Sequence, residues 1–233
     1  MNFDKKQLRN TLLLLLGALI WGTAFVAQSV GSGYVGPYTF LAARSWLACA
    51  FLIVLVLLRR GKARKADPGV PFWINGRMLL RGGVFCGIAL FAASAAQQIG
   101  IGTTSTAKAG FLTALYVVLV PLFGLFFRRK VSGPVWIAVV LSVVSLYLLC
   151  IKGGFSLAPG DLLVLVCAVC FAVHILLIDH FTARCDGVKL SCLQFLFAAI
   201  WSTILALIFD TIDFHVLWEC ILPLLYVGVF SCG

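Results

Sequence analysis

Two cysteines and a histidine share one face of an expected helix, where they could bind a metal or form a nucleophilic pair. Cys167, Cys170 and His174 are spaced three and four residues apart, which places them on the same helical side. Zinc needs about four converging ligands, and no second cluster supplies the remainder. A catalytic cysteine needs an electropositive, partly exposed setting, which the apolar neighbours Val169 and Phe171 do not provide. We therefore interpret the trio as packed thiols beside a hydrogen-bonded or cavity-lining histidine.

Motifs of established enzyme classes are missing from this chain. The sequence contains no His-Glu-x-x-His, no Gly-x-Ser-x-Gly and no pair of aspartates inside an apolar segment. We therefore predict that the protein is not an enzyme and has no catalytic residues, no bound metal and no cofactor.

Arg44 is the strongest chemical anomaly in the chain. It lies seven residues past Pro37, which is about 10 Å into an apolar helix. A charge at that depth costs roughly 2.5–3.5 kcal/mol on insertion scales, so it usually faces a cavity or a partner. A guanidinium presents a fixed fork of donors to carboxylates and phosphates, which favours an anionic group of a bound molecule. The alternative is a structural arginine that extends to the interface or bonds helix-end carbonyls.

Other polar and aromatic residues also fall inside apolar segments and could line a binding site. Trp21 and Gln28 share one helical face, and Thr113 and Tyr116 share another. Such stripes form either hydrogen bonds between helices or contacts to a bound molecule. The neighbours Gln97 and Gln98 point to different sides, and the sequence does not choose between them. The candidate substrate-binding residues are Trp21, Gln28, Arg44, Gln97, Gln98, Thr113, Tyr116, His174 and Gln194.

Pro121 and Lys108 are unusual residues within one apolar run, Thr106–Phe127. Proline cannot donate to the carbonyl four residues earlier, which costs roughly 3 kcal/mol or more in an aqueous helix. In a membrane bundle, neighbouring groups can satisfy that carbonyl. We expect a kink at Pro121, either a moving joint or a static packing feature. Lys108 can extend its stem to the interface and place a positive charge at an entrance.

Seven apolar segments are long enough to cross a bilayer, for which about 20 residues are needed. Hydrophobic residues make up 62% of the chain and charged residues 11%, whereas soluble domains carry about 25% charged residues. Backbone groups in hydrocarbon need internal partners, so the spans must be helices. The predicted fold class is an all-α integral membrane bundle, with spans at Thr11–Val30, Pro37–Leu58, Met78–Ile99, Thr106–Phe127, Pro134–Ile151, Leu162–His180 and Leu190–Phe209, and an eighth beginning near Ile221.

Basic residues collect on one side of the predicted bundle. Lysines and arginines cluster before the first span and after the second, fourth and sixth, segments that lie on one face if the chain crosses at every span. This bias predicts a cytoplasmic N-terminus. The net charge of +10 therefore orients the chain in the lipid bilayer, and we expect no nucleic-acid partner.

The chain resembles itself at an offset of 150 residues. The segment "LIWGTAFVAQ" then aligns with "VCFAVHILLI", so that Trp21 matches Phe171, and Arg44 matches Gln194. Each match is weak alone, but they occur in the same order along the two halves. A repeat of five spans would make the second copy enter the membrane from the opposite face. Inverted repeats of this kind are typical of transporters with a substrate site near the midplane.

A third match falls at an offset of 145 residues, where "LLRGGVFCG" aligns with "LLYVGVFSC". A shorter loop would explain the changed offset. Gly83 and Gly87 within the first of these segments are predicted to allow close helix packing. We predict a first five-helix repeat over residues 1–152 and a second over residues 153–233 that is truncated within its third helix.

The segments "GALIWGTAFVAQ" and "QQIGIGTTSTAKAGFLTALYVVLVPLF" resemble the EamA-type family of the drug/metabolite transporter superfamily. The resemblance implies inverted five-helix repeats, with about eight of ten helices present. It also implies a secondary transporter that moves a small metabolite by alternating access, with efflux across the plasma membrane of a bacterium expected. A channel or sensor built from the same spans is the alternative.

The expected cargo follows from charge. Arg44 and Lys108 carry positive charge in the outer part of the bundle, and we expect no intramembrane acid to balance them. An anionic or zwitterionic compound with a carboxylate, such as an amino acid, is therefore predicted as the small-molecule substrate, and a lipophilic cation would be repelled.

The repeat comparison also predicts an incomplete second half. By the offset of 145, the second copy should extend to about residue 296. We therefore expect a truncated ten-span protein. An antiparallel homodimer is the alternative, although the one-sided distribution of basic residues opposes dual orientation.

The predicted orientation can be tested by cysteine labelling. A cysteine introduced by Ser32→Cys should react with an impermeant maleimide added to intact cells, because the basic side of the bundle faces the cytoplasm. The matched control, Lys62→Cys, should react only after the membrane is opened. Protection at residue 32 together with labelling at residue 62 in intact cells would reverse the orientation.

Overall fold

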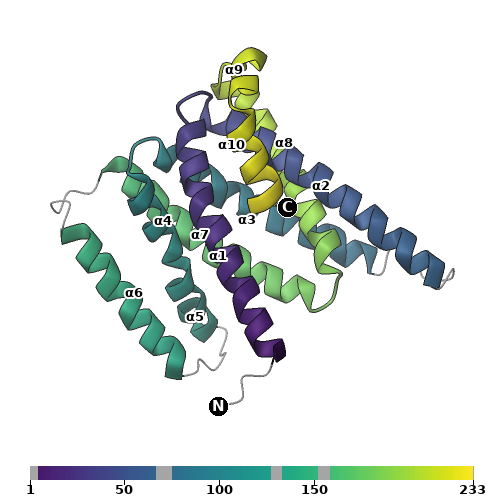
Figure 1. Ribbon diagram of the computed structural model, residues 1–233, viewed down its shortest axis with the longest axis horizontal. Coiled ribbons are helices and arrows are strands. Elements are labelled where there is room, and N and C mark those ends of the chain that lie inside the picture. The colour runs from purple at the N-terminus through teal and green to yellow at the C-terminus, as the bar shows by residue number, and fades with distance from the viewer. Residues whose placement is uncertain (1–4, 67–74, 127–132, 152–157, 233) are drawn as a thin grey trace.

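The computed structural model describes residues 5–66, 75–126, 133–151 and 158–232. Every regular element within these ranges is a helix (Figure 1). The elements are α1 (Lys5–Gly31), α2 (Pro37–Ala66), α3 (Gly76–Ile101), α4 (Thr106–Ala114), α5 (Tyr116–Phe126), α6 (Gly133–Ile151), α7 (Pro159–Thr182), α8 (Gly187–Phe209), α9 (Phe214–Glu219), α10 (Ile221–Leu225) and the π-helix η1 (Tyr226–Ser231).

Six helical runs in the described residues are long and apolar enough to cross a membrane. They are α1, α2, α3, α7, α8 and one continuous run that α4 and α5 form together. The leucines at positions 12–16 of α1 each expose between 53% and 75% of their surface. Exposed leucine in such numbers is tolerated where hydrocarbon is the solvent. The predicted all-α membrane bundle is therefore confirmed.

The run predicted over Thr106–Phe127 is divided into two helices at Leu115. Its amide N–H donates to the carbonyl of Leu112 at 3.2 Å, a tighter turn than an α-helix makes. Pro121 lies inside α5, six residues beyond the break. The break at Leu115 was not predicted, and the kink expected at Pro121 stays a prediction.

The last described segment also departs from a simple span. A short helix that was not predicted, α9, is capped by Asp213, whose carboxylate accepts from the N–H of His215 at 2.8 Å. Beyond α10, the N–H of Cys232 donates to the carbonyl of Val227 at 2.9 Å. This bond spans five residues, which is the signature of a π-helix.

The centre of the bundle is formed by α2, α3, α7 and α8, which make the most extensive helix pairs. Asn75 before α3 donates to the backbone carbonyl of Arg184 after α7, and Thr104 beyond the end of α3 donates to Asp161 at the start of α7. Therefore α3 and α7 run antiparallel. Thr39 at the start of α2 bonds Asp210 at the end of α8, so α2 and α8 are antiparallel as well. In Figure 1, α6 and the far half of α2 lie at opposite edges.

Glycines allow α3 to approach α8 closely. A Cβ atom added to Gly83 would lie 2.6 Å from Cβ of Leu193. One added to Gly87 would lie 2.6 Å from Cβ of Phe197 and 3.0 Å from the backbone oxygen of Gln194. The two separations of 2.6 Å are shorter than real Cβ atoms show, so the predicted close-packing role of the two glycines is confirmed.

Gly228 on η1 makes the corresponding contact with α2. A Cβ atom there would lie 2.8 Å from Cβ of Leu47 and 3.1 Å from the backbone oxygen of Arg44. At the offset of 150, these two residues correspond to the α8 residues that contact Gly87. Gly87 and Gly228 are therefore structural equivalents, at an offset of 141. The predicted offset of 145 for this helix is therefore wrong by one helical turn. It was based on a shared Gly-Val-Phe sequence, which recurs close to the structurally equivalent positions but not at them.

Two apolar clusters extend the same correspondence. One contains buried residues of α2, α10 and η1, and the other contains buried residues of α3, α7 and α8. Residues of one cluster correspond to residues of the other in the repeat. Phe40 corresponds to Leu190 at the offset of 150, and Leu79 to Cys220 and Cys86 to Val227 at the offset of 141. Equivalent helices α2 and α8 run antiparallel, which is the relation expected within an inverted repeat. The packing supports that architecture, and the boundaries 1–152 and 153–233 stay a prediction.

The close α3–α8 contact generates a stability prediction. Gly87→Ala should lower the free energy of unfolding by roughly 1–3 kcal/mol, because the methyl group forces the helices apart. Gly17→Ala is the matched control, since a Cβ atom there meets nothing within 4 Å. Thermal unfolding in detergent should show a lower Tm for the first variant and an unchanged or higher Tm for the second. Equal behaviour of the two variants would contradict the packing argument.

Candidate functional site

Arg44 lies in the interior of the bundle, 4% exposed. Its Nη1 donates to Oε1 of Gln28 on α1. The uncharged thiols of Cys167 and Cys232 lie near its guanidinium. Among the residues that the structure describes, no carboxylate forms an ion pair with Arg44. A buried guanidinium with a single neutral hydrogen-bond partner retains donors for another acceptor.

Gln97 and Gln98 extend the polar network in two directions. Nε2 of Gln98 donates to the backbone oxygen of Gln28 at 3.3 Å, and Nε2 of Gln97 donates to Oγ1 of Thr113 at 3.3 Å. Both glutamines are at most 3% exposed. The structure thus resolves what their adjacency left open: both are interior residues, one directed to α1 and the other to α4.

A second buried pair joins α7 to α8. Nε2 of His174 and Oε1 of Gln194 lie 2.9 Å apart. Because an amide oxygen only accepts, the imidazole donates through Nε2 in this arrangement. The first two helices of each half are therefore linked by one buried side-chain pair, Gln28–Arg44 in the first and His174–Gln194 in the second.

Three aromatic rings meet between the two halves. The ring of Trp21 lies 5.6 Å from that of Tyr116 and 6.3 Å from that of Phe171, centroid to centroid. Tyr116 and Phe171 are also 6.3 Å apart. All three side chains are half-buried. Phe171 was not predicted as a site residue, although its match to Trp21 at the offset of 150 was a signal: equivalent residues near a two-fold axis face one another.

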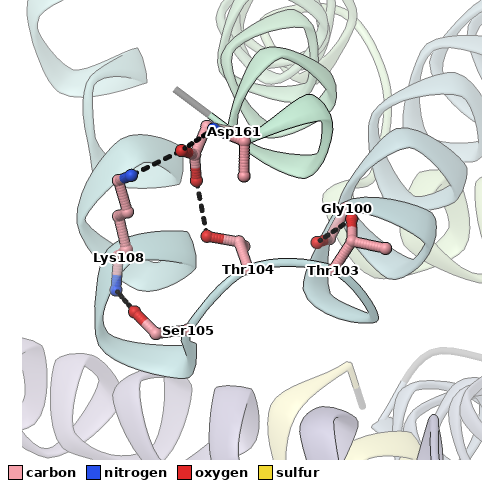
Figure 2. Close-up of polar contacts among 7 residues, drawn as sticks. Gly100, Thr103, Thr104, Ser105, Lys108 and Asp161 are labelled. Atoms are coloured by element: carbon pink, nitrogen blue, oxygen red, sulfur yellow. Dashed lines mark hydrogen bonds and ion pairs between the residues drawn. The ribbon is translucent and has the colours of Figure 1, made fainter. Parts of the chain in front are cut away.

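Lys108 is not an unbalanced entrance charge. Its Nζ lies 2.5 Å from Oδ2 of Asp161, and Oδ1 of Asp161 accepts from Thr104 at 2.5 Å (Figure 2). The N–H of Ala158 also donates to this carboxylate at 2.8 Å. Asp161 is fully buried in the first turn of α7. The expectation that no intramembrane acid balances Lys108 is therefore wrong, because folding brings together residues 53 positions apart.

The remaining predicted elements occupy distinct places. Pro121 lies within α5, five residues after the Tyr116 ring of the aromatic cluster. A surface pocket of about 310 Å³ is lined by Leu79 and the segment joining α7 to α8, and it contains none of the predicted binding residues. In the described ranges, no group of three or more histidine, cysteine, aspartate or glutamate side chains could hold a metal.

The chain matches the EamA-like transporter family over residues 9–151. Two proteins of Archaeoglobus fulgidus, each named an uncharacterized transporter, are similar to it. One is 31% identical over 232 residues, covering 97% of this chain and 67% of the relative. The other is 27% identical over 199 residues, covering 82% and 64%. The chain thus spans about two thirds of the length of these relatives, and slightly less of the second.

A solved crystal structure has a similar fold. It superposes with a TM-score of 0.63 at 22% sequence identity, covering 94% of this chain and 73% of the other. At that level of identity the likeness concerns the fold.

The two members of the Lys108–Asp161 ion pair should differ in how much stability is lost when one of them is replaced. Lys108→Met should lower the free energy of unfolding by roughly 3 kcal/mol, because it leaves a buried carboxylate without its cation. Asp161→Asn should cost less, since the Lys108 side chain is 24% exposed and can reach water. Denaturant titration in detergent measures both, with the double variant as control. A larger loss of unfolding free energy for Asp161→Asn than for Lys108→Met would contradict the role of Lys108 as the cation that neutralises the buried carboxylate.

Proposed function

Because the chain belongs to the EamA-like transporter family, and is thus a multi-pass membrane transporter, we propose that it exports a small metabolite bearing a carboxylate. Transport rather than catalysis is the proposed activity, by alternating access in the plasma membrane with the N-terminus in the cytoplasm. The observation that carries the proposal is the buried charge of Arg44, which has no carboxylate partner among the described residues.

The surroundings of Arg44 favour a bound molecule over a purely structural role. A structural arginine at this depth would be expected to pair with an acid or to bond several carbonyls. Its one hydrogen-bond partner in the described chain is the amide oxygen of Gln28. A substrate carboxylate would accept two parallel hydrogen bonds from the guanidinium. The half-buried rings of Trp21, Tyr116 and Phe171 suit the apolar part of such a molecule.

Two groups of contacts at one end of the bundle support alternating access. Asp161 holds the start of α7 to α4, and Asp210 accepts from the N–H and hydroxyl of Thr39 at 2.7 and 2.8 Å. Gly100 and Gly160 bring α3 and α7 into contact at the same end: a Cβ on either would lie within 2.9 Å of the other's backbone oxygen. In the predicted orientation this end faces outward. The proposed cycle therefore begins from a state closed to the outside, and opening it requires these contacts to break.

A channel or a sensor is the second candidate, since each needs only spans and a polar lining. Substrate counterflow into proteoliposomes separates the candidates. Vesicles containing the purified full-length protein are loaded with an unlabelled amino acid, and a trace of the labelled compound is added outside. A carrier accelerates exchange and shows transient accumulation of label, whereas a pore only equilibrates it. Equilibration without overshoot across a panel of amino acids would overturn the carrier proposal.

Arg44→Gln should raise the KM for exchange of a carboxylate substrate roughly tenfold or more, because a hydrogen-bonded charge is lost. Glutamine is neutral and shorter than arginine, so thermal unfolding of the variant in detergent checks that the fold is retained. The matched control is Arg81→Gln, at an exposed position near the start of α3, which should leave exchange unchanged. Unaltered kinetics in Arg44→Gln, at equal protein in the membrane, would assign Arg44 to a structural role.

A further inference from the structure

One buried side-chain polar atom has no hydrogen-bond partner among the described residues, and it is Oε1 of Gln98. The orientation of this amide is determined by its neighbour. Nε2 faces the backbone oxygen of Gln28 at 3.3 Å, and a backbone oxygen can only accept. Exchanging the two amide atoms would set two acceptors against each other. Oε1 is therefore the atom that lacks a donor, in a side chain that is 1% exposed.

Gln98 and Arg44 are linked through one shared neighbour, Gln28 of α1. Gln28 accepts from Arg44 through its side-chain oxygen and from Gln98 through its backbone oxygen. Arg44, which retains spare donors, and Gln98, which has a spare acceptor, thus bond the same residue of α1. The complementary molecule carries an anionic group and, close to it, a hydrogen-bond donor.

We propose that Oε1 of Gln98 is the specificity-determining acceptor for an N–H or O–H group near the substrate carboxylate. The cargo is then an α-amino or α-hydroxy acid, and an unsubstituted carboxylic acid is rejected. This inference rests on the proposed function, and it adds a criterion that Arg44 alone does not impose. A substrate without the donor leaves Oε1 buried and unpaired, whereas a substrate with it completes the network. Sites that bond a substrate hydroxyl or amine discriminate strongly against the analogue that lacks it.

The test uses matched acids that differ only at the α-carbon. In proteoliposomes, counterflow of labelled alanine is inhibited by unlabelled alanine, lactate or propionate. Counterflow of labelled leucine is inhibited by leucine, 2-hydroxy-4-methylpentanoate or 4-methylpentanoate. We expect the unsubstituted acid in each set to inhibit about 10- to 100-fold more weakly than its amino or hydroxy counterpart, the range expected for one unpaired buried acceptor. The order of the amino and hydroxy acids identifies which donor is preferred.

A variant separates Gln98 from other sources of selectivity. Gln98→Met keeps the length of the side chain and removes the acceptor, so the amino and hydroxy acids should lose their advantage over the unsubstituted acid. Gln7→Met, at an exposed position of α1, is the matched control and should retain the wild-type order. Thermal unfolding of each variant checks that folding is unchanged.

The outcomes distinguish this inference from the function on which it rests. Equal inhibition by all three acids of a set in the wild-type protein overturns the role of Gln98 and leaves the carrier proposal intact; a buried water would then be the partner of Oε1. Selectivity that survives Gln98→Met overturns the assignment to this residue. Absence of counterflow with both labelled amino acids overturns the proposed function for these cargoes, and the inference falls with it.

Discussion

In each half of the chain, a helix that contains glycine packs closely against the second helix of the other half. The bundle depends on these two contacts. Between helices in lipid there is no hydrophobic force, so association rests on van der Waals packing and on hydrogen bonds. Gly87 against α8 and Gly228 against α2 bring the backbones together at equivalent positions. In the same bundle, the rings of Trp21 on α1 and Phe171 on α7 lie 6.3 Å apart, centroid to centroid.

The same packing explains where polar groups are buried. A polar atom in a membrane interior needs a partner, and side chains from different helices supply it at Gln28–Arg44 and at His174–Gln194. At one end of the bundle, Asp161 combines a lysine, a hydroxyl and a backbone N–H. The central network remains incomplete, with spare donors on Arg44 and a spare acceptor on Gln98. A network completed by a transported molecule would be expected to have this character, whereas a purely structural network would be saturated.

Much of the candidate site was visible in the sequence because unusual residues are conspicuous in an apolar background. Arg44, Gln28 and Gln98 were selected on that ground, and all are buried in the same network. Phe171 was not selected, since an aromatic residue is ordinary in a membrane helix. Asp161 was not selected, since it lies one residue before the predicted span Leu162–His180, yet the first turn of α7 is buried against α3 and α4.

Sequence alone determined the properties that depend on composition and local period. Apolar runs specify the spans, because hydrocarbon requires internally bonded backbone, and the offset of 150 identifies the equivalence of Trp21 with Phe171. Tertiary structure decided the properties that depend on how distant helices align. It identified Gly87 and Gly228 as the equivalent residues of the third helix in each repeat. It also paired Lys108 with Asp161 and determined the separate partners of Gln97 and Gln98. A shift of one helical turn leaves the hydrophobic pattern unchanged but exchanges every interhelical contact, so only packing between helices selects the register.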